Sequence, residues 1–273
     1  RYGYKNVCIA GGVGLNCTLN GKIRNLPWVA KMFVQPAAND GGLCVGAAYL
    51  GAIKGGERVE GFDNIYLGPQ INLEIAGELL ENWGLKPQML AKPYVVAAER
   101  ISEGAVVAWM QGRSEFGPRA LGNRSLLGDP RRNDIKDRLN LIKKRENWRP
   151  VAPSVISGVK DYFLGSHPSE YMTIAVPATE EARAEIPAAI HVDNTARVQL
   201  VGETNHPYYE LINSFREITD VPAVLNTSLN GKNEPLCNTV EDSVRLFYTS
   251  AIDDLFVGNW HISKNNKTSS KTR

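Results

Sequence analysis

The stretch from Arg113 to Arg149 concentrates positive charge in a chain that is close to neutral elsewhere. It holds eleven Lys or Arg against five Asp or Glu, whereas the whole chain of 273 residues carries a net charge of +2. Arg113, Arg119 and Arg124 lie beside glycines, directly after an apolar run at residues 105–112 that predicts a strand. Guanidinium groups bind phosphate or carboxylate through paired hydrogen bonds, and glycines let backbone N–H groups approach the same anion. The stretch therefore predicts an anion-binding pocket, to which the rigid segment around Arg149 contributes.

Two other interpretations of this charge remain open. The helical part, residues 136–145, could be a solvated charged face, which is the usual meaning of a charge run. Nucleic acid is the competing ligand, but proteins that bind its backbone spread Lys and Arg over a face, often with exposed aromatic side chains. The window holds only Phe116 and Trp148 as aromatic residues, and the sequence pI is about 8.3. A small molecule that carries phosphate fits better, and we expect no nucleic-acid partner.

Two glycine-containing loops near the start of the chain have the chemistry of anion or metal sites. GGVGLN, residues 11–16, separates a predicted strand from a predicted helix, where free N–H groups and the helix dipole favour phosphate. An ordinary tight turn is the alternative. NDGG, residues 39–42, repeats this placement and adds the carboxylate of Asp40. That carboxylate could cap a helix or hold a metal ion.

A third loop, LNTSLNGKNEP at residues 225–235, carries small hydrogen-bonding side chains after a predicted strand. Its small donors Asn226, Thr227, Ser228 and Asn230 could orient an amide or a phosphate there. A turn closed by its own side chains is the equal alternative.

Composition limits the class of protein. The chain is 43% hydrophobic and 22% charged, which suits one large or two modest globular domains. No apolar run approaches the ~20 residues that span a bilayer, so we expect no membrane partner. The four cysteines show no CxxC spacing, and the four histidines show no metal-ligand spacing. Reduced thiols in a cytoplasmic protein are the expectation.

The order of predicted elements indicates an α/β fold. Residues 1–60 follow the pattern strand, glycine loop, helix, twice over. Residues 61–90 are polar and glycine-rich at their start and predict a connection. Residues 91–262 alternate helices and strands and predict a second domain, and residues 263–273 form a polar tail. The chain begins without Met and reaches an apolar strand almost at once, so we expect a piece of a longer protein.

Six segments together resemble one family, the O-carbamoyltransferases of nodulation-factor and antibiotic biosynthesis (NodU/NolO/CmcH type), and within it the nodulation proteins. SEFGPRALGNRS is a specific signature, and the segments follow the family's order over nearly the whole chain. They are CIAGGVGLNCTLNGKI, PAANDGGLCVGAA, GRSEFGPRALGNRSLLGDPR, RENWRPVAPSV, HVDNTARVQLV and LNTSLNGKNEPLCNTVEDSVRLF.

The resemblance implies the C-terminal part of an actin-like, ATPase-type domain at residues 1–60 and a YrdC-like domain at residues 91–262. The YrdC-like domain would join carbamoyl phosphate and ATP into carbamoyl-adenylate. The actin-like domain would pass the carbamoyl group to a hydroxyl of a sugar, a lipo-oligosaccharide or an antibiotic. The implied cofactors are ATP, iron (Fe²⁺) in the complete protein, and Mg²⁺. A homodimer is left open, as is the alternative of a non-catalytic module that binds nucleotide phosphates or RNA.

The resemblance also implies roles for residues. The implied catalytic residues are Arg119, Arg149 and Ser228. The family's iron site needs a histidine pair at HxxxH spacing, which this sequence lacks, so we expect incomplete metal binding and no acceptor transfer by this chain alone. The remaining implied residues are Arg113, Arg119 and Arg124 for carbamoyl phosphate, Lys143, Lys144, Arg145 and Arg149 for nucleotide phosphates, Asn226 and Ser228 for the Ser/Asn loop, Gly11, Gly12 and Asn16 for the nucleotide loop, and Asp40 for the metal.

Overall fold

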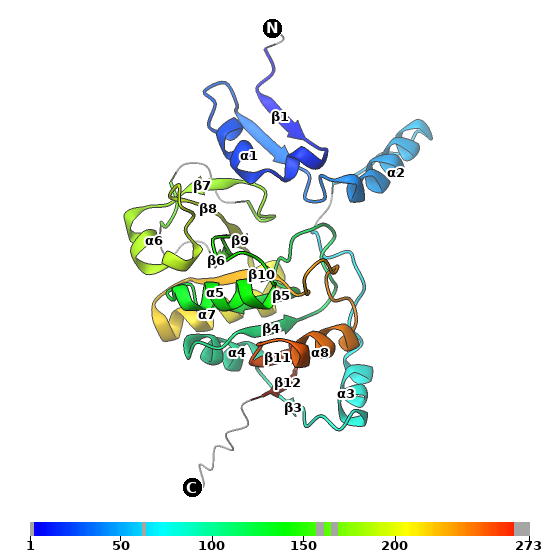
Figure 1. Cartoon of the computed structure of the whole chain (residues 1–273). Coiled ribbons are helices and arrows are strands. Elements are labelled where there is room, and N and C mark those ends of the chain that lie inside the picture. The colour runs from blue at the N-terminus through cyan, green and yellow to red at the C-terminus, as the bar shows by residue number, and fades with distance from the viewer. Residues whose placement is uncertain (1–2, 62–63, 157–160, 165–168, 265–273) are drawn as a thin grey trace.

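The computed structural model describes residues 3–61, 64–156, 161–164 and 169–264. A small parallel sheet begins the chain and lies at one end of the molecule, next to a large mixed sheet (Figure 1). The small sheet pairs β1 with β2 in register, with Asn6 opposite Lys31 and Ile9 opposite Val34. The strand–loop–helix repeat predicted here is present, as β1 (Asn6–Ile9), α1 (Cys17–Arg24), β2 (Lys31–Val34) and α2 (Leu43–Lys54).

The large sheet has eight strands in the order β3-β12-β11-β4-β5-β10-β6-β9. The pairs β4–β11 and β6–β9 are parallel and the other pairs are antiparallel, so the predicted α/β class is confirmed with a mixed sheet. The strands are β3 (Gln88–Met89), β4 (Val107–Met110), β5 (Arg124–Gly128), β6 (Ala152–Ile156), β9 (Gln199–Val201), β10 (Ala223–Ser228), β11 (Asp254–Val257) and β12 (Trp260–Ser263).

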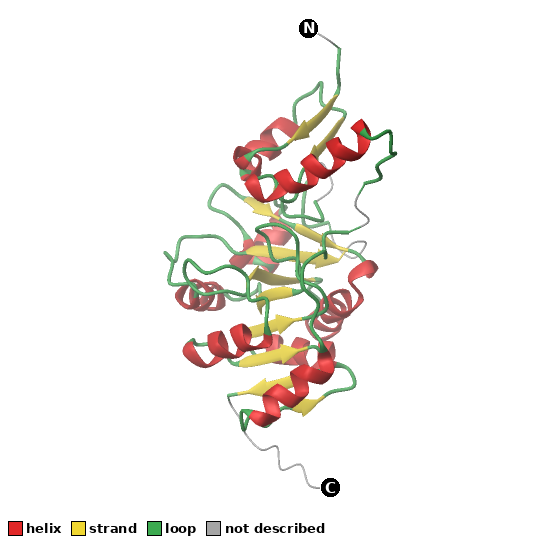
Figure 2. Cartoon of the chain, turned by 90° about the vertical axis from the view of Figure 1, so that its right-hand side faces the viewer, coloured by secondary structure: helices red, strands yellow, loops and turns green. Residues whose placement is uncertain are grey.

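Helices lie on both sides of this sheet (Figure 2), and the core forms between them and the strands. The central strands β4 and β5 bury every residue, including Trp109 and Leu126, because both faces of the sheet are covered. A two-stranded antiparallel pair, β7 (Ala175–Pro177) with β8 (Thr195–Arg197), lies between the two sheets. The helices are α3 (Leu73–Asn82), α4 (Pro93–Ser102), α5 (Asn133–Ile142), α6 (Glu180–Glu185), α7 (His206–Thr219) and α8 (Val240–Thr249). In the described part of the chain, no helix is long and apolar enough to cross a membrane.

The segment predicted as a connection, residues 61–90, contributes to the large sheet. It contains α3 and β3, and β3 extends the sheet by pairing with β12. Gly77 of α3 lies so close to the ring of Trp260 that a Cβ atom would be 2.5 Å from it. The polar start of the segment concealed this helix, whose buried residues include Ala76 and Leu80.

The small sheet β1–β2 and the large eight-stranded sheet are joined through α1 and the β7–β8 pair. Asn20 is buried and its Nδ2 donates to the carbonyls of Gly14 and Thr173, both at 2.8 Å. At Gly21 a Cβ atom would lie 2.3 Å from the carbonyl oxygen of Ala175, so only glycine allows this approach. The first turn of α1 is thereby held against the part of the molecule that carries the arginine-rich loop.

Candidate functional site

The loop between β4 and β5, which we call the signature loop, is held together by hydrogen bonds to a buried carboxylate, Glu115. Its Oε1 accepts from the backbone N–H groups of Leu121 at 2.7 Å, Asn123 at 2.8 Å and Arg124 at 3.2 Å. Burial raises the pKa of Glu115, and these three N–H groups oppose that shift. The carboxylate therefore closes residues 115–124 into a ring from which Arg119 projects. The sequence analysis missed Glu115, although it is the single acidic residue of the signature SEFGPRALGNRS.

Gly122 fixes the same loop against α7. Its φ is +107°, in the left-handed region, and a Cβ atom would lie 2.1 Å from the ring of Tyr208. The glycine of the signature is thus required both by backbone conformation and by packing.

Arg124 supports the loop from inside the sheet. It is fully buried at 0% exposure. Its Nη1 donates to the carbonyls of Gln111 at 2.6 Å and Asn123 at 2.9 Å, and its Nη2 donates to those of Pro69 and Gly112. Burial lowers the pKa of Arg124, and Glu115 opposes this. With its donors directed at four carbonyls, Arg124 positions the loop and is left out of the ligand set proposed below.

Arg113 is exposed and turns toward the segment before α3. Its Nη2 donates to the carbonyl of Leu67 at 2.8 Å. This contact ties the start of the loop to residues 64–70, where Gln70 and Arg113 also form a β-bridge. The structure therefore gives Arg113 a structural contact away from Arg119.

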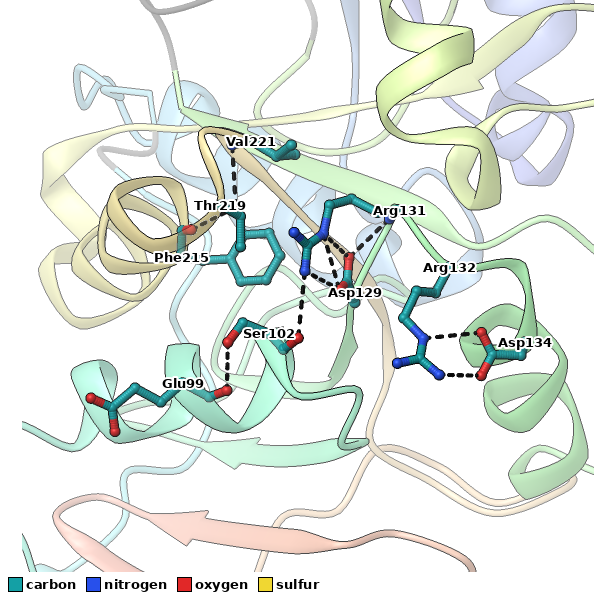
Figure 3. Close-up of polar contacts among 9 residues, drawn as sticks. All are labelled: Glu99, Ser102, Asp129, Arg131, Arg132, Asp134, Phe215, Thr219 and Val221. Atoms are coloured by element: carbon teal, nitrogen blue, oxygen red, sulfur yellow. Dashed lines mark hydrogen bonds and ion pairs between the residues drawn. The ribbon is translucent and has the colours of Figure 1, made fainter.

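Arg131 and Arg132, at the end of the same basic stretch, are neutralised by neighbouring carboxylates (Figure 3). Arg131 binds the buried carboxylate of Asp129 through Nε at 3.0 Å and Nη2 at 2.7 Å, and it stacks over Phe215. Arg132 pairs with Asp134 at 2.8 Å. Part of the charge that drew attention to this stretch is therefore structural.

Three arginines from distant parts of the sequence form what we call the cation cluster: Arg119, Arg145 and Arg197. Burial, together with the positive charges of Arg119 and Arg145, lowers the pKa of Arg197 to about 10. Burial also lowers the pKa of Arg119 and of Arg145. Arg197 was missed as a site residue, although it lies in the quoted segment HVDNTARVQLV. Its distance from the loop in sequence gave no signal of this proximity.

The cation cluster contains buried N–H groups without partners. Among the described residues, the Nε of Arg197 and one terminal nitrogen of Arg145, Nη2, find no hydrogen-bond acceptor. Arg119 donates to the carbonyl of Leu15 at 3.4 Å. Leu15 belongs to what we call the first module, which comprises β1, β2, α1, α2 and the loops between them. A buried donor left unpaired costs about 1–3 kcal/mol, and more when it is charged. An anion bound among the three guanidinium groups would remove that cost.

Lys143 clamps the loop that follows β10. Its Nζ donates to the carbonyl of Ser228 at 2.7 Å, to Ser228 Oγ at 2.9 Å and to the carbonyl of Asn230 at 2.9 Å, and it also contacts Asn230 Oδ1. Burial lowers the pKa of Lys143 to about 7, and the nearby charge of Arg145 contributes. Asn230 was predicted as one of the small hydrogen-bonding side chains of this loop, and its contact with Lys143 was not.

Asn226 lies deeper and belongs to a network between strands. It is 1% exposed, and its Nδ2 donates to the carbonyl of Ala120, to Ser154 Oγ at 3.0 Å and to Gln199 Oε1 at 3.1 Å. These contacts link β10 to β6, β9 and the signature loop. Asn226 therefore positions the loop after β10 and does not line the cavity beside Ser228.

Lys144 and Arg149 lie outside the cation cluster. Lys144 is exposed, has a φ of 47°, and lines a separate cavity with Gly231 and Lys232. Arg149 is half-exposed, pairs with Glu146 at 2.7 Å and lies over the ring of Trp148. Its charge lowers the pKa of Arg145, which places it at the edge of the cluster.

The glycine loops of the first module are joined to each other. The N–H of Gly11 donates to the carbonyl of Ala38 at 2.7 Å, and Gly12 begins a short 3₁₀ turn. Asn16 Oδ1 accepts from the N–H of Leu19 at 3.0 Å, so Asn16 is the N-cap of α1. Both loops border a cavity of about 790 Å³ whose walls are mostly apolar, with Gly11 and Asp40 at its rim.

Asp40 is exposed at the start of a 3₁₀ turn. Within the described ranges, no three His, Cys, Asp or Glu side chains come together in a way that could hold a metal ion. The residues present therefore do not fit an iron site.

A second cavity, of about 490 Å³, brings together three of the predicted loops. It is lined by Asn39 and Gly41 from the first module, by residues 115–118 of the signature loop, and by Ser228 and Asn230. Gly117 makes this meeting close, because a Cβ atom there would lie 3.2 Å from the carbonyl oxygen of Pro36. The cavity lies between the first module and the rest of the chain, next to the loop after β10 that Lys143 binds.

Comparison with known proteins gives matches over most of the chain. The family described as carbamoyltransferase C-terminus matches residues 98–264, and carbamoyltransferase N-terminus matches residues 1–49. The chain is 44% identical to the nodulation protein NolNO of Sinorhizobium fredii, over 96% of this chain and 40% of that protein. It is 41% identical to the nodulation protein NolO of Bradyrhizobium diazoefficiens, over 96% of this chain and 50% of that protein. The chain thus spans half or less of the length of these two relatives.

Two solved structures show more distant likeness. Full-length HypF in a phosphate- and nucleotide-bound form is 21% identical, with a TM-score of 0.45, over 64% of this chain and 26% of that chain. P. abyssi Sua5 complexed with L-threonine is 16% identical, with a TM-score of 0.44, over 61% of this chain and 46% of that chain. At this distance neither structure assigns a ligand to this chain.

Proposed function

Because the chain belongs to the carbamoyltransferase family, we propose that it carries the activating half of an ATP-dependent O-carbamoyltransferase. In that half, carbamoyl phosphate and ATP become carbamoyl-adenylate. The net reaction consumes one water and releases phosphate from carbamoyl phosphate and pyrophosphate from ATP. The complete protein would then pass the carbamoyl group to a hydroxyl of a sugar, a lipo-oligosaccharide or an antibiotic. The alternative of a non-catalytic RNA-binding or nucleotide-binding module is not favoured.

The observation that carries the proposal is the cation cluster. Arg119 and Arg145 lie close enough to Arg197 that their charges lower its pKa, and two buried N–H donors of the cluster have no acceptor among the described residues. Like charges held together in a partly buried site are costly, and a bound polyanion removes the cost. Phosphate groups, which accept paired hydrogen bonds from guanidinium, fit this arrangement best.

We assign separate roles to the residues around the cluster. Arg119, Arg145 and Arg197 would hold the phosphates of carbamoyl phosphate and ATP and offset the charge that develops during displacement at phosphorus. Arg149, at the rim, would add charge to the entrance. Ser228, whose Oγ accepts from Lys143 at 2.9 Å and donates to Asn230 Oδ1 at 2.6 Å, would orient the carbamoyl group or a phosphate.

The first module would receive the activated group. Its loops at Asn39 and Gly41 border the same 490 Å³ cavity as Ser228, so a product formed beside Ser228 would face the first module. Gly11, Gly12 and Asn16 remain candidates for a nucleotide loop in that module, and Mg²⁺ a candidate companion of ATP. We derive no step through iron, because Asp40 lacks partners for it among the described residues.

The test is pyrophosphate release from ATP in the presence of carbamoyl phosphate. We expect release that requires both substrates and falls at least tenfold in Arg145→Ala, while Arg132→Ala, a charge removed from the same stretch but paired with Asp134, retains it. Release without any carbamoylated sugar would support the activating half alone. If no pyrophosphate appears while both ligands bind, the chain binds phosphates without the proposed chemistry. Equal rates in Arg145→Ala and the parent chain would contradict the site.

A further inference from the structure

Lys144, which its sequence position groups with Lys143 and Arg145, lines a cavity distinct from the proposed active site. The cavity has a volume of about 530 Å³ and lies between the end of α5, the loop at residues 231–234 and α8. The left-handed backbone at Lys144, with φ 47°, reverses the chain direction at the end of α5. Of its lining residues, only Glu234 also borders the 490 Å³ cavity beside Ser228.

The walls of this cavity have the composition of a polyanion site. Lys144, Lys232 and Arg245 supply three positive charges against the single carboxylate of Glu234. Its floor is apolar, because Ile142 and Leu246 reach it, each 5% exposed to solvent overall. An excess of two positive charges over an apolar floor suits a small organic molecule with two or more negative charges.

The one acid in the cavity is connected to the active-site loop. Glu234 Oε1 accepts from Arg245 Nη1 at 2.9 Å, and Glu234 Oε2 accepts from the N–H of Gly231 at 3.1 Å. The carbonyl of Glu234 accepts from Asn230 Nδ2 at 2.5 Å. Asn230 in turn accepts from Lys143. Glu234 and Asn230 therefore connect the side chain of Arg245 to the loop that holds Ser228.

We propose that the cavity lined by Lys144, Lys232 and Arg245 binds a small polyanionic metabolite, and that this binding weakens nucleotide binding at the cation cluster. A bound anion competes with Glu234 for Arg245 and repels the Glu234 carboxylate. The Glu234 carboxylate then releases the N–H of Gly231, which follows Asn230 in the chain, and the Ser228 loop loses one of its supports. The coupling to nucleotide rests on the proposed function, whereas the binding itself does not.

The binding experiment uses calorimetric titration of the whole chain with citrate and, separately, with inorganic phosphate. The parent for this arm is Arg145→Ala/Arg197→Ala, which removes the anion site of the cation cluster. We expect one binding site, weakened at least tenfold when Lys232→Ala/Arg245→Ala is added. Arg58→Ala/Lys86→Ala removes two charges from exposed positions outside both cavities and should change nothing. Lys144→Ala/Lys232→Ala keeps the Glu234–Arg245 pair and should weaken binding as well.

The two anions separate a carboxylate site from a phosphate site, and binding of either one supports the cavity. If neither binds, or if affinity is equal in all variants, the proposal is overturned. In the second arm, saturating citrate, or phosphate if only phosphate binds, should weaken ATP binding to the unmodified chain at least threefold, and not in Lys232→Ala/Arg245→Ala. If the affinity for ATP is the same with the cavity occupied and empty, the regulatory part of the proposal is overturned. If ATP does not bind the unmodified chain even when the cavity is empty, the proposed function fails and the cavity site stands.

Discussion

The ammonium of Lys143 and the hydroxyl of Ser228 lie 2.9 Å apart, and Lys143 also binds the carbonyl of Ser228 at 2.7 Å. A residue of the basic segment after α5 therefore fixes the loop after β10, 85 residues later in the chain. This contact joins two sequence motifs into one site. It also makes the geometry of Ser228 depend on the protonation of Lys143.

The first prediction concerns that proton. Because burial and Arg145 lower the pKa of Lys143 to about 7, the ligand-free side chain is largely neutral at pH 8. A bound phosphate favours the charged form and raises this pKa, so ATP binding at pH 8 should take up a proton and weaken as pH rises above 7. Calorimetry in buffers of different ionisation enthalpy measures the uptake. In Lys143→Met the uptake should vanish, and an unchanged uptake would assign it to another group.

Gly122→Ala should destabilise the fold. The substitution forces a side chain into φ +107° and against the ring of Tyr208, so we expect a loss of about 3 kcal/mol in the free energy of unfolding. Gly12→Ala is the matched control, because nothing lies within 4 Å of a Cβ atom there. Urea denaturation measures both, and equal midpoints would show that the Gly122 contact is dispensable.

Arg119→Ala should weaken carbamoyl phosphate binding. The loss of one charge-assisted contact is worth about 1.5–3 kcal/mol, or roughly 10-fold to 150-fold in affinity. Arg132→Ala, in the same basic stretch, should leave affinity unchanged since Arg132 is paired with Asp134. Titration calorimetry distinguishes them, and a parallel loss in both variants would point to general electrostatic attraction in place of a site.

Iron should not be retained at one ion per chain. Asp40 is exposed and has too few ligand partners in the described part of the protein, and a metal in such a site generally needs three or more protein ligands. Elemental analysis after incubation with Fe²⁺ and desalting tests this. One iron per chain, lost in Asp40→Ala, would show that a site forms from few ligands.

The sequence predicted the α/β class and most of the helices, but it did not predict α3, β3 or β5, and the anion-binding loop stays a prediction. The strands and helices of the first module follow from hydrophobic periodicity, which is a local property. The roles of individual cations were not accessible in the same way. Arg124 is fully buried among carbonyls, although arginine is almost always exposed, and Lys144 lines a cavity that its neighbour Arg145 does not border.

Long-range contacts account for the rest of what the sequence could not supply. Arg197, on β8, comes near Arg119 only in the folded chain. Glu115 binds three N–H groups within its own loop, yet a carboxylate between glycines is also typical of an exposed turn. The helix α3 was hidden by the polar residues that precede it. Each of these depends on tertiary packing, which periodicity does not report.

The central claim, that the cation cluster exists to bind phosphate, is tested most directly by Arg197→Met. Removing a buried guanidinium that repels Arg119 and Arg145 and leaves its own Nε unpaired should raise the melting temperature of the ligand-free protein. The same change should weaken ATP and carbamoyl phosphate binding at least tenfold, because the charge that destabilises the empty site attracts the ligand. Thermal unfolding with and without ATP measures both effects in one protein. A variant that melts lower than the parent and binds both ligands equally well would mean that Arg197 is structural, and would contradict the account.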